Sequence, residues 1–389
     1  MNQILSFMKK NRGHERCPLT ALKSQQDHIL VKRRKTRQVK IGQVPIGGGA
    51  PIAVQSMTKT DTRDIKATLA QVKSLEQVDC EIVRLAVPDT EAVEALGEIK
   101  RRTKVPLVAD IHFDYRLAIA SLEKGVDGLR INPGNIGSKE KVKEVVKAAK
   151  EKKIPVRIGV NSGSLERYVL EKYGGATAEA MVESALRHIR ILEDLDFSAI
   201  KISLKAPHVY RTVKAYQLLA SKVDYPFHAG ITEAGGFLSG TVKSSAGLGF
   251  LITHGLADTV RVSLTAPPEE EVRIAFLILS SLGLRSRGPD IISCPVCGRC
   301  EMDFFRIASE IEKSVADIKE NIRVAVMGCM VNGPGEAKEA DIGLVCGRGV
   351  GIVYRDGHLY RKLQEKEIIP EFIKEVRKAA QESHKVPVS

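Results

Sequence analysis

The chain has 389 residues, 60 lysines and arginines against 47 aspartates and glutamates, a formal charge of +13, and seven cysteines. A hydrophobic content of 43% excludes a chain that is disordered throughout, and the length indicates two domains or three small ones. No run approaches the ~18–20 apolar residues of a membrane-spanning helix, and no secretory signal pattern opens the chain. The odd number of cysteines, three of them crowded at Cys294, Cys297 and Cys300, fits reduced thiols and a metal site better than a disulfide framework, so we expect a cytoplasmic protein.

Most of the positive charge lies in residues 1–40. This segment contains eleven basic and two acidic residues, which is +9 and leaves +4 for the other 349 residues. The run Lys32–Arg37 has the composition of a nucleic-acid patch, but no aromatic residues are interleaved there for base stacking. An arginine-rich, acid-poor composition is also typical of an organellar transit peptide. We expect residues 1–36 to be a solvated basic extension that is dispensable for activity.

From residue 52 onward, short apolar β-rich runs alternate with helical patterns of about 12–18 residues. A preceding segment, Val39–Gly49, is predicted to form a hairpin that closes the bottom of the fold. Two of the helical patterns repeat apolar residues at i, i+3, i+4 and i+7, one of them behind a candidate N-cap at Ser138: Val142, Val145, Val146 and Ala149, then Val182, Ala185, Leu186 and Ile189. Eight runs are candidate strands: Ile52–Ser56, Glu81–Val87, Pro106–His112, Gly128–Asn132, Pro155–Asn161, Ala199–Lys205, Pro226–Thr232 and Thr259–Leu264.

Eight strand–helix units in about 230 residues predict a (β/α)8 TIM barrel over residues 37–285. A doubly wound sheet ranks second, because such sheets usually have fewer strands. The composition changes after Pro289. Residues 286–389 are predicted to form a smaller α+β domain, with a helix that carries Phe304, Ile307, Ile311, Val315 and Ile318 on one face, a strand Arg323–Met327 and a terminal helix from about Glu367.

Polar and cationic residues gather where the candidate strands end, and in TIM barrels those ends form the active-site mouth. Alternation along each strand places the following residues on the inward face: Asp110 and His112, Arg130 and Asn132, Arg157 and Asn161, Lys201 with Ser203 and Lys205, and Arg261 with Ser263. Strand seven ends at Thr232 and Glu233. Some of these cations could form ion pairs inside the barrel. Two acids, Asp110 and Glu233, are too few to neutralise all five cations, however. The mouth is therefore predicted to hold a polyanion such as a diphosphate.

The second domain carries a cysteine cluster. The pattern C-x2-C-x2-C covers Cys294, Cys297 and Cys300, and Cys329 follows later, so the spacing alone nominates these four as thiolate ligands. A C-P-x-C-G knuckle also occurs in zinc ribbons, which leaves zinc open, although no second C-x2-C pair follows. The segment Gly328–Glu336 is predicted to form a tight turn with exposed N–H groups, and it ends with a carboxylate. A carboxylate oxygen is a harder metal ligand than a thiolate and exchanges more easily.

Seven motifs run in order along the chain: AVQSMT at 53–58, VADIHF at 108–113, LRINPGN at 129–135, GVNSGS at 159–164, ITEAG at 231–235, SCPVCGR at 293–299 and GCMVNGPGE at 328–336. Together they resemble the bacterial 4-hydroxy-3-methylbut-2-enyl diphosphate synthase family, from about Val39 to the C-terminal helix. The resemblance implies an oxidoreductase with a [4Fe-4S] cluster on the methylerythritol phosphate route of isoprene biosynthesis. Such enzymes convert 2-C-methyl-D-erythritol 2,4-cyclodiphosphate to the linear diphosphate, with two electrons and loss of water.

The resemblance also implies roles for individual residues. It assigns the metal ligands to Cys294, Cys297, Cys329 and Glu336, and it makes Cys300 an extra thiol. Polar groups near the reacting carbons are Asp110, His112 and Glu233, the last a proton donor. The cyclic diphosphate is held by Arg130, Asn132, Arg157, Asn161, Lys205, Arg261 and Ser263, with Arg63 as a further contact. A flavodoxin or ferredoxin donates electrons, and the family forms a head-to-tail homodimer without nucleic acid or membrane partners.

Two other hypotheses remain open at this point. One is a pterin-diphosphate-binding barrel enzyme with a structural zinc domain, and the other is a zinc-knuckle RNA-binding protein that uses the basic extension. A brown protein with about four irons per chain after anaerobic purification favours the cluster. A colourless protein with one zinc contradicts it.

Overall fold

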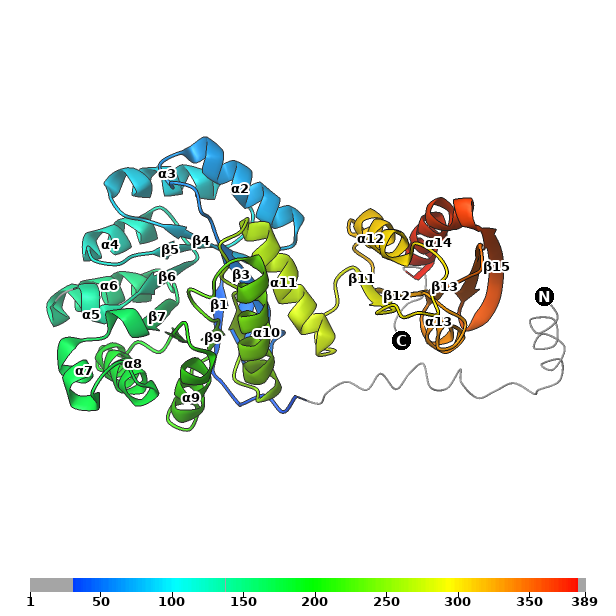
Figure 1. Ribbon diagram of the computed structural model, residues 1–389. Helices are drawn as coiled ribbons and strands as arrows, with labels where there is room; N and C mark the ends of the chain where they lie inside the picture. The colour runs from blue at the N-terminus through cyan, green and yellow to red at the C-terminus, as the bar shows by residue number, and fades with distance from the viewer. Residues whose placement is uncertain (1–30, 137, 384–389) are drawn as a thin grey trace. The chain divides into compact units, whose positions relative to one another are not determined.

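The computed structural model describes residues 31–136 and 138–383 and divides into two compact units, with the division between Leu284 and Arg285 (Figure 1). Most of the predicted basic extension, residues 1–30, lies outside the described residues. Within the described ranges, no helix is long and apolar enough to cross a membrane.

The first unit is a barrel of eight parallel strands. The sheet order is β8-β7-β6-β5-β4-β3-β10-β9, and a bridge between Ile202 and Phe227 joins its two ends. The prediction of a TIM barrel is confirmed, but the last two strands are much shorter than expected. The strands are β3 Ala53–Met57, β4 Ile82–Ala86, β5 Leu107–Asp110, β6 Gly128–Ile131, β7 Val156–Asn161, β8 Ile200–Lys205, β9 His228–Ala229 and β10 Thr259–Val260.

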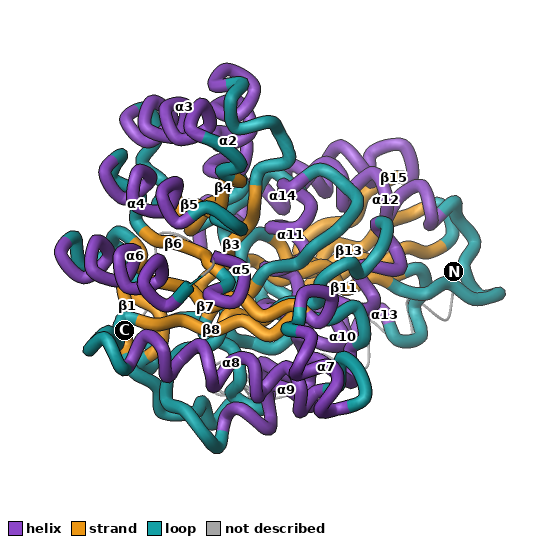
Figure 2. Tube along the Cα trace, turned by 90° about the vertical axis from the view of Figure 1, so that its left-hand side faces the viewer, coloured by secondary structure: helices purple, strands orange, loops and turns teal. Residues whose placement is uncertain are grey.

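Helices enclose this barrel on its outside (Figure 2). The apolar stripe predicted behind Ser138 is buried on α6, and that of the next periodic segment is buried on α8 except for the half-buried Leu186. A single 3-10 turn, Ser162–Ser164, follows β7. The helices are α2 Ile65–Gln77, α3 Thr90–Arg101, α4 Tyr115–Glu123, α5 Pro133–Ile136, α6 Lys139–Glu151, α7 Arg167–Tyr173, α8 Ala178–Glu193, α9 Val209–Ala220, α10 Phe237–Thr253 and α11 Pro268–Ser281.

A hairpin closes the amino-terminal end of the barrel, as predicted. Its strands, β1 Gln38–Ile41 and β2 Val44–Gly47, pair antiparallel. Its apolar side chains form a separate buried cluster with residues at or near the starts of three barrel strands, and this cluster, the apolar plug, consists of Val39, Ile41, Ile46, Ala53, Ile82 and Val108. The bottom of the barrel is therefore sealed by apolar packing.

Residues just before this hairpin also contact the barrel. Arg33 forms an ion pair with Asp258, with 2.7 Å between Nη2 and Oδ1. Arg34 stacks over the ring of Phe227 at 4.0 Å from the centroid and donates to the carbonyl oxygens of Val223 and Tyr225. A boundary at residue 36 would cut through these contacts, so we propose that the dispensable segment ends near residue 30.

Deleting residues 1–30 is therefore expected to leave the melting temperature unchanged, whereas deleting 1–36 is expected to lower it by about 5–10 °C. The longer deletion leaves the buried Asp258 carboxylate without its arginine, a loss of about 2–4 kcal/mol. Thermal unfolding of the two truncations, with the full-length double variant Arg33→Met/Arg34→Met as a control, checks this expectation. Equal melting temperatures for both truncations would contradict it.

The second unit is a five-stranded mixed sheet in the order β11-β12-β13-β14-β15. β11 to β13 are parallel, and β14 and β15 continue antiparallel. Its strands are β11 Pro289–Ser293, β12 Ile322–Met327, β13 Ile342–Gly347, β14 Val350–Arg355 and β15 His358–Gln364, and its helices are α12 Phe304–Val315, α13 Gly333–Glu339 and α14 Ile368–Ser383, the last preceded by a 3-10 turn, Glu365–Glu367.

Two apolar clusters hold this second unit together. α12 and α14 pack on the sheet in one cluster, and α13 packs in the other. The predicted apolar face of α12 is buried, and Ile318 joins the same cluster from the turn beyond the end of the helix.

Candidate functional site

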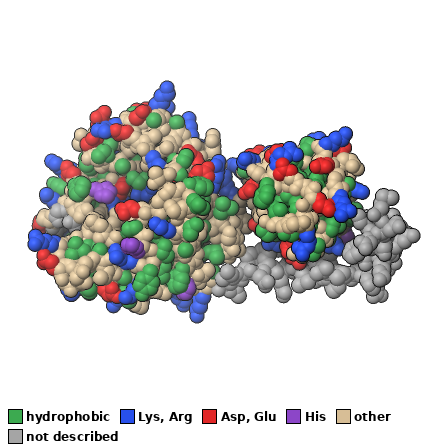
Figure 3. Space-filling view, viewed as in Figure 1, with side chains coloured by type: hydrophobic (Ala, Val, Ile, Leu, Met, Phe, Trp, Pro, Cys, Tyr) green, Lys and Arg blue, Asp and Glu red, His purple; other side chains and the backbone are tan. Residues whose placement is uncertain are grey.

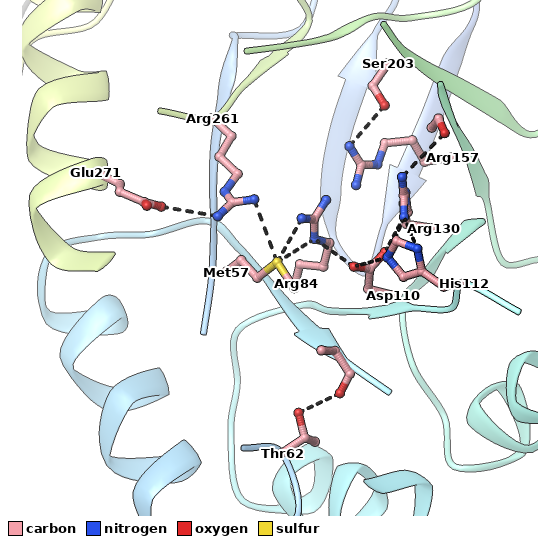
Figure 4. A network of polar contacts seen from close by, with 12 residues as sticks. Met57, Thr62, Arg84, Asp110, His112, Arg130, Arg157, Ser203, Arg261 and Glu271 are labelled. Carbon is pink, nitrogen blue, oxygen red and sulfur yellow. Dashed lines mark hydrogen bonds and ion pairs between the residues drawn. The ribbon is translucent and has the colours of Figure 1, made fainter. Parts of the chain in front are cut away.

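Above the apolar plug, the barrel interior is filled mainly by polar and cationic side chains. TIM barrels usually fill this space with branched apolar residues. The cations Arg130, Arg157, Lys201 and Lys205 are each no more than 5% exposed, and so is Asp110. Figure 4 shows several of these side chains converging from neighbouring strands. An interior of this composition is suited to a charged ligand rather than to packing.

Asp110, His112 and Arg130 form one contact group (Figure 4). Asp110 ends β5 and lies opposite Arg130 of β6 in the register, and its Oδ1 is 3.1 Å from Arg130 Nη1. His112 Nε2 lies 3.3 Å from Asp110 Oδ2 and 2.9 Å from Arg130 Nη1. The guanidinium lies over Gly159, where a Cβ would be 2.4 Å from Arg130 Nε. Glycine is thus needed at residue 159 for this arginine to point into the barrel.

Arg84 belongs to the same network, although the sequence reasoning did not select it. Its Nε is 3.8 Å from Asp110 Oδ2, and its Nη2 is 2.8 Å from the sulfur of Met57, which Arg261 Nη1 approaches at 3.7 Å. Burial lowers the pKa of Arg84 to about 9 against the opposing effect of Asp110, so the guanidinium stays charged at neutral pH. Arg84 lies mid-strand, and the alternation of Ile82, Arg84 and Ala86 on β4 was the signal that could have found it.

The cations of β7 and β8 have few partners. Arg157 Nη1 donates to Ser203 Oγ at 3.2 Å, but its Nε and Nη2, like Lys201 Nζ, have no hydrogen-bond partner among the described residues. Burial lowers the pKa of Lys201 and Lys205 well below the usual range, and the charge of Arg157 lowers it further. His228 of β9, also missed from sequence, is fully buried and its pKa is lowered by burial and then by Arg157. Unpaired buried cations are unfavourable, and a bound anion would offset that cost.

The remaining predicted mouth residues lie at the same carboxyl ends of the strands. Asn132 is buried just after β6, Asn161 ends β7 opposite Lys205 in the register, and Ser263 is half-buried after β10. Glu233 is exposed on the loop after β9, with φ of +51°, a left-handed conformation that is uncommon for a residue other than glycine.

Arg63, the further contact implied by the resemblance, is partly exposed. Its guanidinium forms ion pairs with Asp61, with 2.6 Å between Nη2 and Oδ2, and with Asp89, with 3.2 Å between Nη1 and Oδ2. Both carboxylates are themselves about half exposed. An anion would therefore compete with these two acids for Arg63.

Four cysteines of the second unit, Cys294, Cys297, Cys300 and Cys329, lie beyond the carboxyl ends of two neighbouring parallel strands, whereas Cys346 is buried within β13. Cys294 follows β11, and its backbone N–H donates to Val326 of β12 at 3.0 Å. Cys329 comes two residues after the end of β12, and the turn that follows leads into α13, where Glu336 is exposed in the first turn. Cys297 is exposed, and hydrogen bonds from Arg299 lower the pKa of its thiol. All are free thiols.

This donor set suits an iron–sulfur group in its chemistry, since free thiols in loops and one carboxylate in the first turn of α13 follow the carboxyl ends of neighbouring strands. The side chains are not gathered in advance, however. Within residues 31–136 and 138–383, no three Cys, His, Asp or Glu side chains are close enough to hold a metal ion. Ligation would therefore require these loops to close around the group.

Cys300, nominated by the spacing alone, is partly buried, as Cys294 is. Its thiol donates to the Met302 carbonyl oxygen at 3.4 Å, and its sulfur lies 3.4 Å from where a Cβ on Gly328 would be. It packs partly buried against the same apolar cluster as Phe304. Cys300 thus lies beneath the turn that carries Cys329.

A TIM barrel with a buried cationic mouth, followed by an α+β unit with free thiols on one sheet edge, defines a barrel enzyme for an anionic substrate. Residues 36–276 match the GcpE TIM-barrel domain, and residues 290–378 match the GcpE protein C-terminal domain. The chain belongs to the GcpE family.

Curated relatives match nearly the whole chain. A protein of Geobacter sulfurreducens named 4-hydroxy-3-methylbut-2-en-1-yl diphosphate synthase (flavodoxin) is 57% identical over 352 residues, which is 90% of this chain and 100% of the relative. A protein of Geobacillus kaustophilus with the same name is 55% identical over 353 residues, 91% of this chain and 94% of the relative. Among solved structures, the Yersinia pestis dihydropteroate synthase covers 63% of this chain and 98% of its own, with a TM-score of 0.46 and 11% identity.

Proposed function

We propose that this protein is an iron–sulfur oxidoreductase that converts 2-C-methyl-D-erythritol 2,4-cyclodiphosphate to 4-hydroxy-3-methylbut-2-enyl diphosphate, with two electrons and loss of water. The observation that carries the proposal is the match of both units to one family whose relatives share that synthase name. The buried cations of the barrel supply a physical reason, because they lack enough acids to balance them.

The barrel mouth would bind the diphosphate. Guanidinium groups bind phosphate oxygens through a planar fork and lysine supplies a compact charge. The substrate-binding residues would be Arg130, Asn132, Arg157, Asn161, Lys205, Arg261 and Ser263, to which the geometry adds Arg84. The same cations would stabilise the charge that develops on the diphosphate when its carbon–oxygen bond breaks.

Asp110, His112 and Glu233 would act on the reacting carbons. Asp110 holds Arg130 and His112 in fixed positions through both carboxylate oxygens. Glu233 stands outside this network on a loop, where an exposed carboxyl group can exchange protons with solvent, so we assign it the proton-donor role.

Cys294, Cys297, Cys329 and Glu336 would hold a [4Fe-4S] cluster. When bound, such a cluster supplies the electrons for the reduction. The curated name supports flavodoxin as the donor, and a ferredoxin is the other candidate of suitable potential. A head-to-tail homodimer completes the proposal. The apolar residues Phe237, Leu238 and Val242 on α10 are exposed and suited to self-association. Figure 3 shows hydrophobic side chains on the face of the first unit that is turned to the viewer.

The pterin-binding barrel with a zinc domain is not favoured, because the curated relatives carry the diphosphate synthase name. The test of the proposed function is turnover of the cyclic diphosphate by anaerobically purified protein with a chemically reduced flavodoxin. We expect the linear diphosphate as product and about four irons per chain. A colourless, zinc-containing protein without turnover would overturn the proposal.

A further inference from the structure

The carboxylate of Glu271 lies at the barrel mouth, although it belongs to the first turn of a helix. Glu271 is in α11, and its side chain is 1% exposed. Its neighbours Glu269 and Glu270 contact the outer residues Ser74 and Arg273 instead. Of the acids in this turn, Glu271 therefore faces the strands.

Both carboxylate oxygens of Glu271 have two partners. Oε1 accepts from the backbone N–H of Leu264 at 3.0 Å and lies 3.0 Å from Lys59 Nζ. Oε2 accepts from Ser56 Oγ at 3.0 Å and lies 3.6 Å from Arg261 Nη2. One side chain thus links the carboxyl ends of β3 and β10.

This arrangement fixes two mouth residues that follow β10. The guanidinium of Arg261 is held between Glu271 on one side and the sulfur of Met57 on the other, as Figure 4 shows. The N–H of Leu264 adjoins Ser263, so the backbone beside that hydroxyl is fixed by the same carboxylate. Holding a long side chain in place before binding removes an entropic cost from binding.

We propose that Glu271 is a positioning residue, which holds Arg261 and the Ser263 segment ready for a diphosphate and does not itself touch the substrate. The inference rests on the proposed function, since it assumes that Arg261 contacts a diphosphate. A carboxylate at this position also keeps Arg261 from turning away while the mouth is free of ligand.

The test is binding of inorganic diphosphate to the full-length anaerobic holoenzyme by titration calorimetry. We expect Glu271→Gln to weaken binding of diphosphate by about 5- to 30-fold. The amide removes the negative charge that faces Arg261, and its N–H groups replace a carboxylate oxygen that accepts hydrogen bonds. Glu270→Gln, in the same helical turn but paired with Arg273 on the outside of the helix, is the matched control and is expected to bind as the wild type does.

A double-variant cycle separates positioning from general stability. In an Arg261→Met background, Glu271→Gln is expected to weaken binding less than it does in the wild-type background, because the part of its effect that acts through Arg261 is already lost and only the part through the Ser263 segment remains. An equal loss in both backgrounds, or no loss in either, would overturn the inference. If Glu271→Gln does not fold, Glu271→Asp keeps the charge and is expected to weaken binding by about 2- to 5-fold, and wild-type affinity in that variant would also overturn it. Failure of wild-type protein to bind diphosphate would instead contradict the substrate site itself.

Discussion

Replacing Cys329 by serine is expected to give a protein without bound iron and without measurable turnover. A serine hydroxyl stays protonated where a cysteine thiol becomes a thiolate ligand, so one of the proposed cluster ligands is lost. Iron and sulfide content per chain and the visible absorbance of anaerobically purified protein measure the effect. We expect about four irons in the wild type and close to none in Cys329→Ser.

Two further variants test which residue completes the ligand set. Glu336→Ala is expected to lose or destabilise the cluster, whereas Cys300→Ser is expected to keep it. Cys300 already donates to the Met302 carbonyl oxygen and packs against apolar residues. Cys80→Ser is a control outside the second unit, since burial raises the pKa of that thiol to about 12. Loss of the cluster in Cys300→Ser, with full iron in Glu336→Ala, would refute the carboxylate assignment.

Asp110→Asn is expected to destabilise the protein by about 3–5 kcal/mol, because it removes the carboxylate from a buried pair. Asp110 Oδ1 is 3.1 Å from Arg130 Nη1, and its Oδ2 is 3.8 Å from Arg84 Nε. The amide leaves both guanidinium groups without their shared negative charge. Denaturant unfolding at pH 7 measures the loss, and Asp224→Asn, which breaks the exposed pair with Arg37, is expected to cost less than about 1 kcal/mol.

The same variant has a defined pH dependence. Burial alone would raise the pKa of Asp110, but Arg84, His112 and Arg130 outweigh burial and lower it. A lowered folded-state pKa means that the stabilisation is complete above the unfolded pKa of about 3.9 and disappears as the pH falls through the folded value. The stability difference between wild type and Asp110→Asn is therefore expected to be present at pH 7 and to shrink below about pH 4. Equal stabilities at pH 7 would contradict the pairing.

The barrel was predictable from sequence because its strands and helices have different periods. Alternation along β7 and β8 placed Arg157, Lys201 and Lys205 inside correctly, and these side chains are buried. The last two strands are shorter than predicted, since β9 and β10 have two residues each while their apolar runs continue into loops that are still buried. A buried loop segment has the same run of apolar residues as a buried strand, so the sequence pattern does not distinguish the two.

The residues that were missed depend on contacts between distant segments. Glu271 lies in a run of three glutamates, which indicates a surface helix, and its partners Ser56 and Lys59 are more than 200 residues away in the chain. Arg84 lies in the middle of β4 and was not among the inward-facing residues predicted from the sequence. The cysteine ligand set is a different case, because spacing alone nominates Cys300, and the positions of the side chains do not select among the candidate ligands.

The apolar plug beneath the barrel has a kinetic consequence. Because the β1–β2 hairpin seals the bottom, the mouth is the route by which the barrel interior communicates with solvent. Substrate and product of the proposed reaction both carry a diphosphate, so the cations that capture one also retain the other. Product must therefore leave through the entrance before the next substrate can enter, which makes the product a competitive inhibitor and ties the turnover rate to the release of an anion.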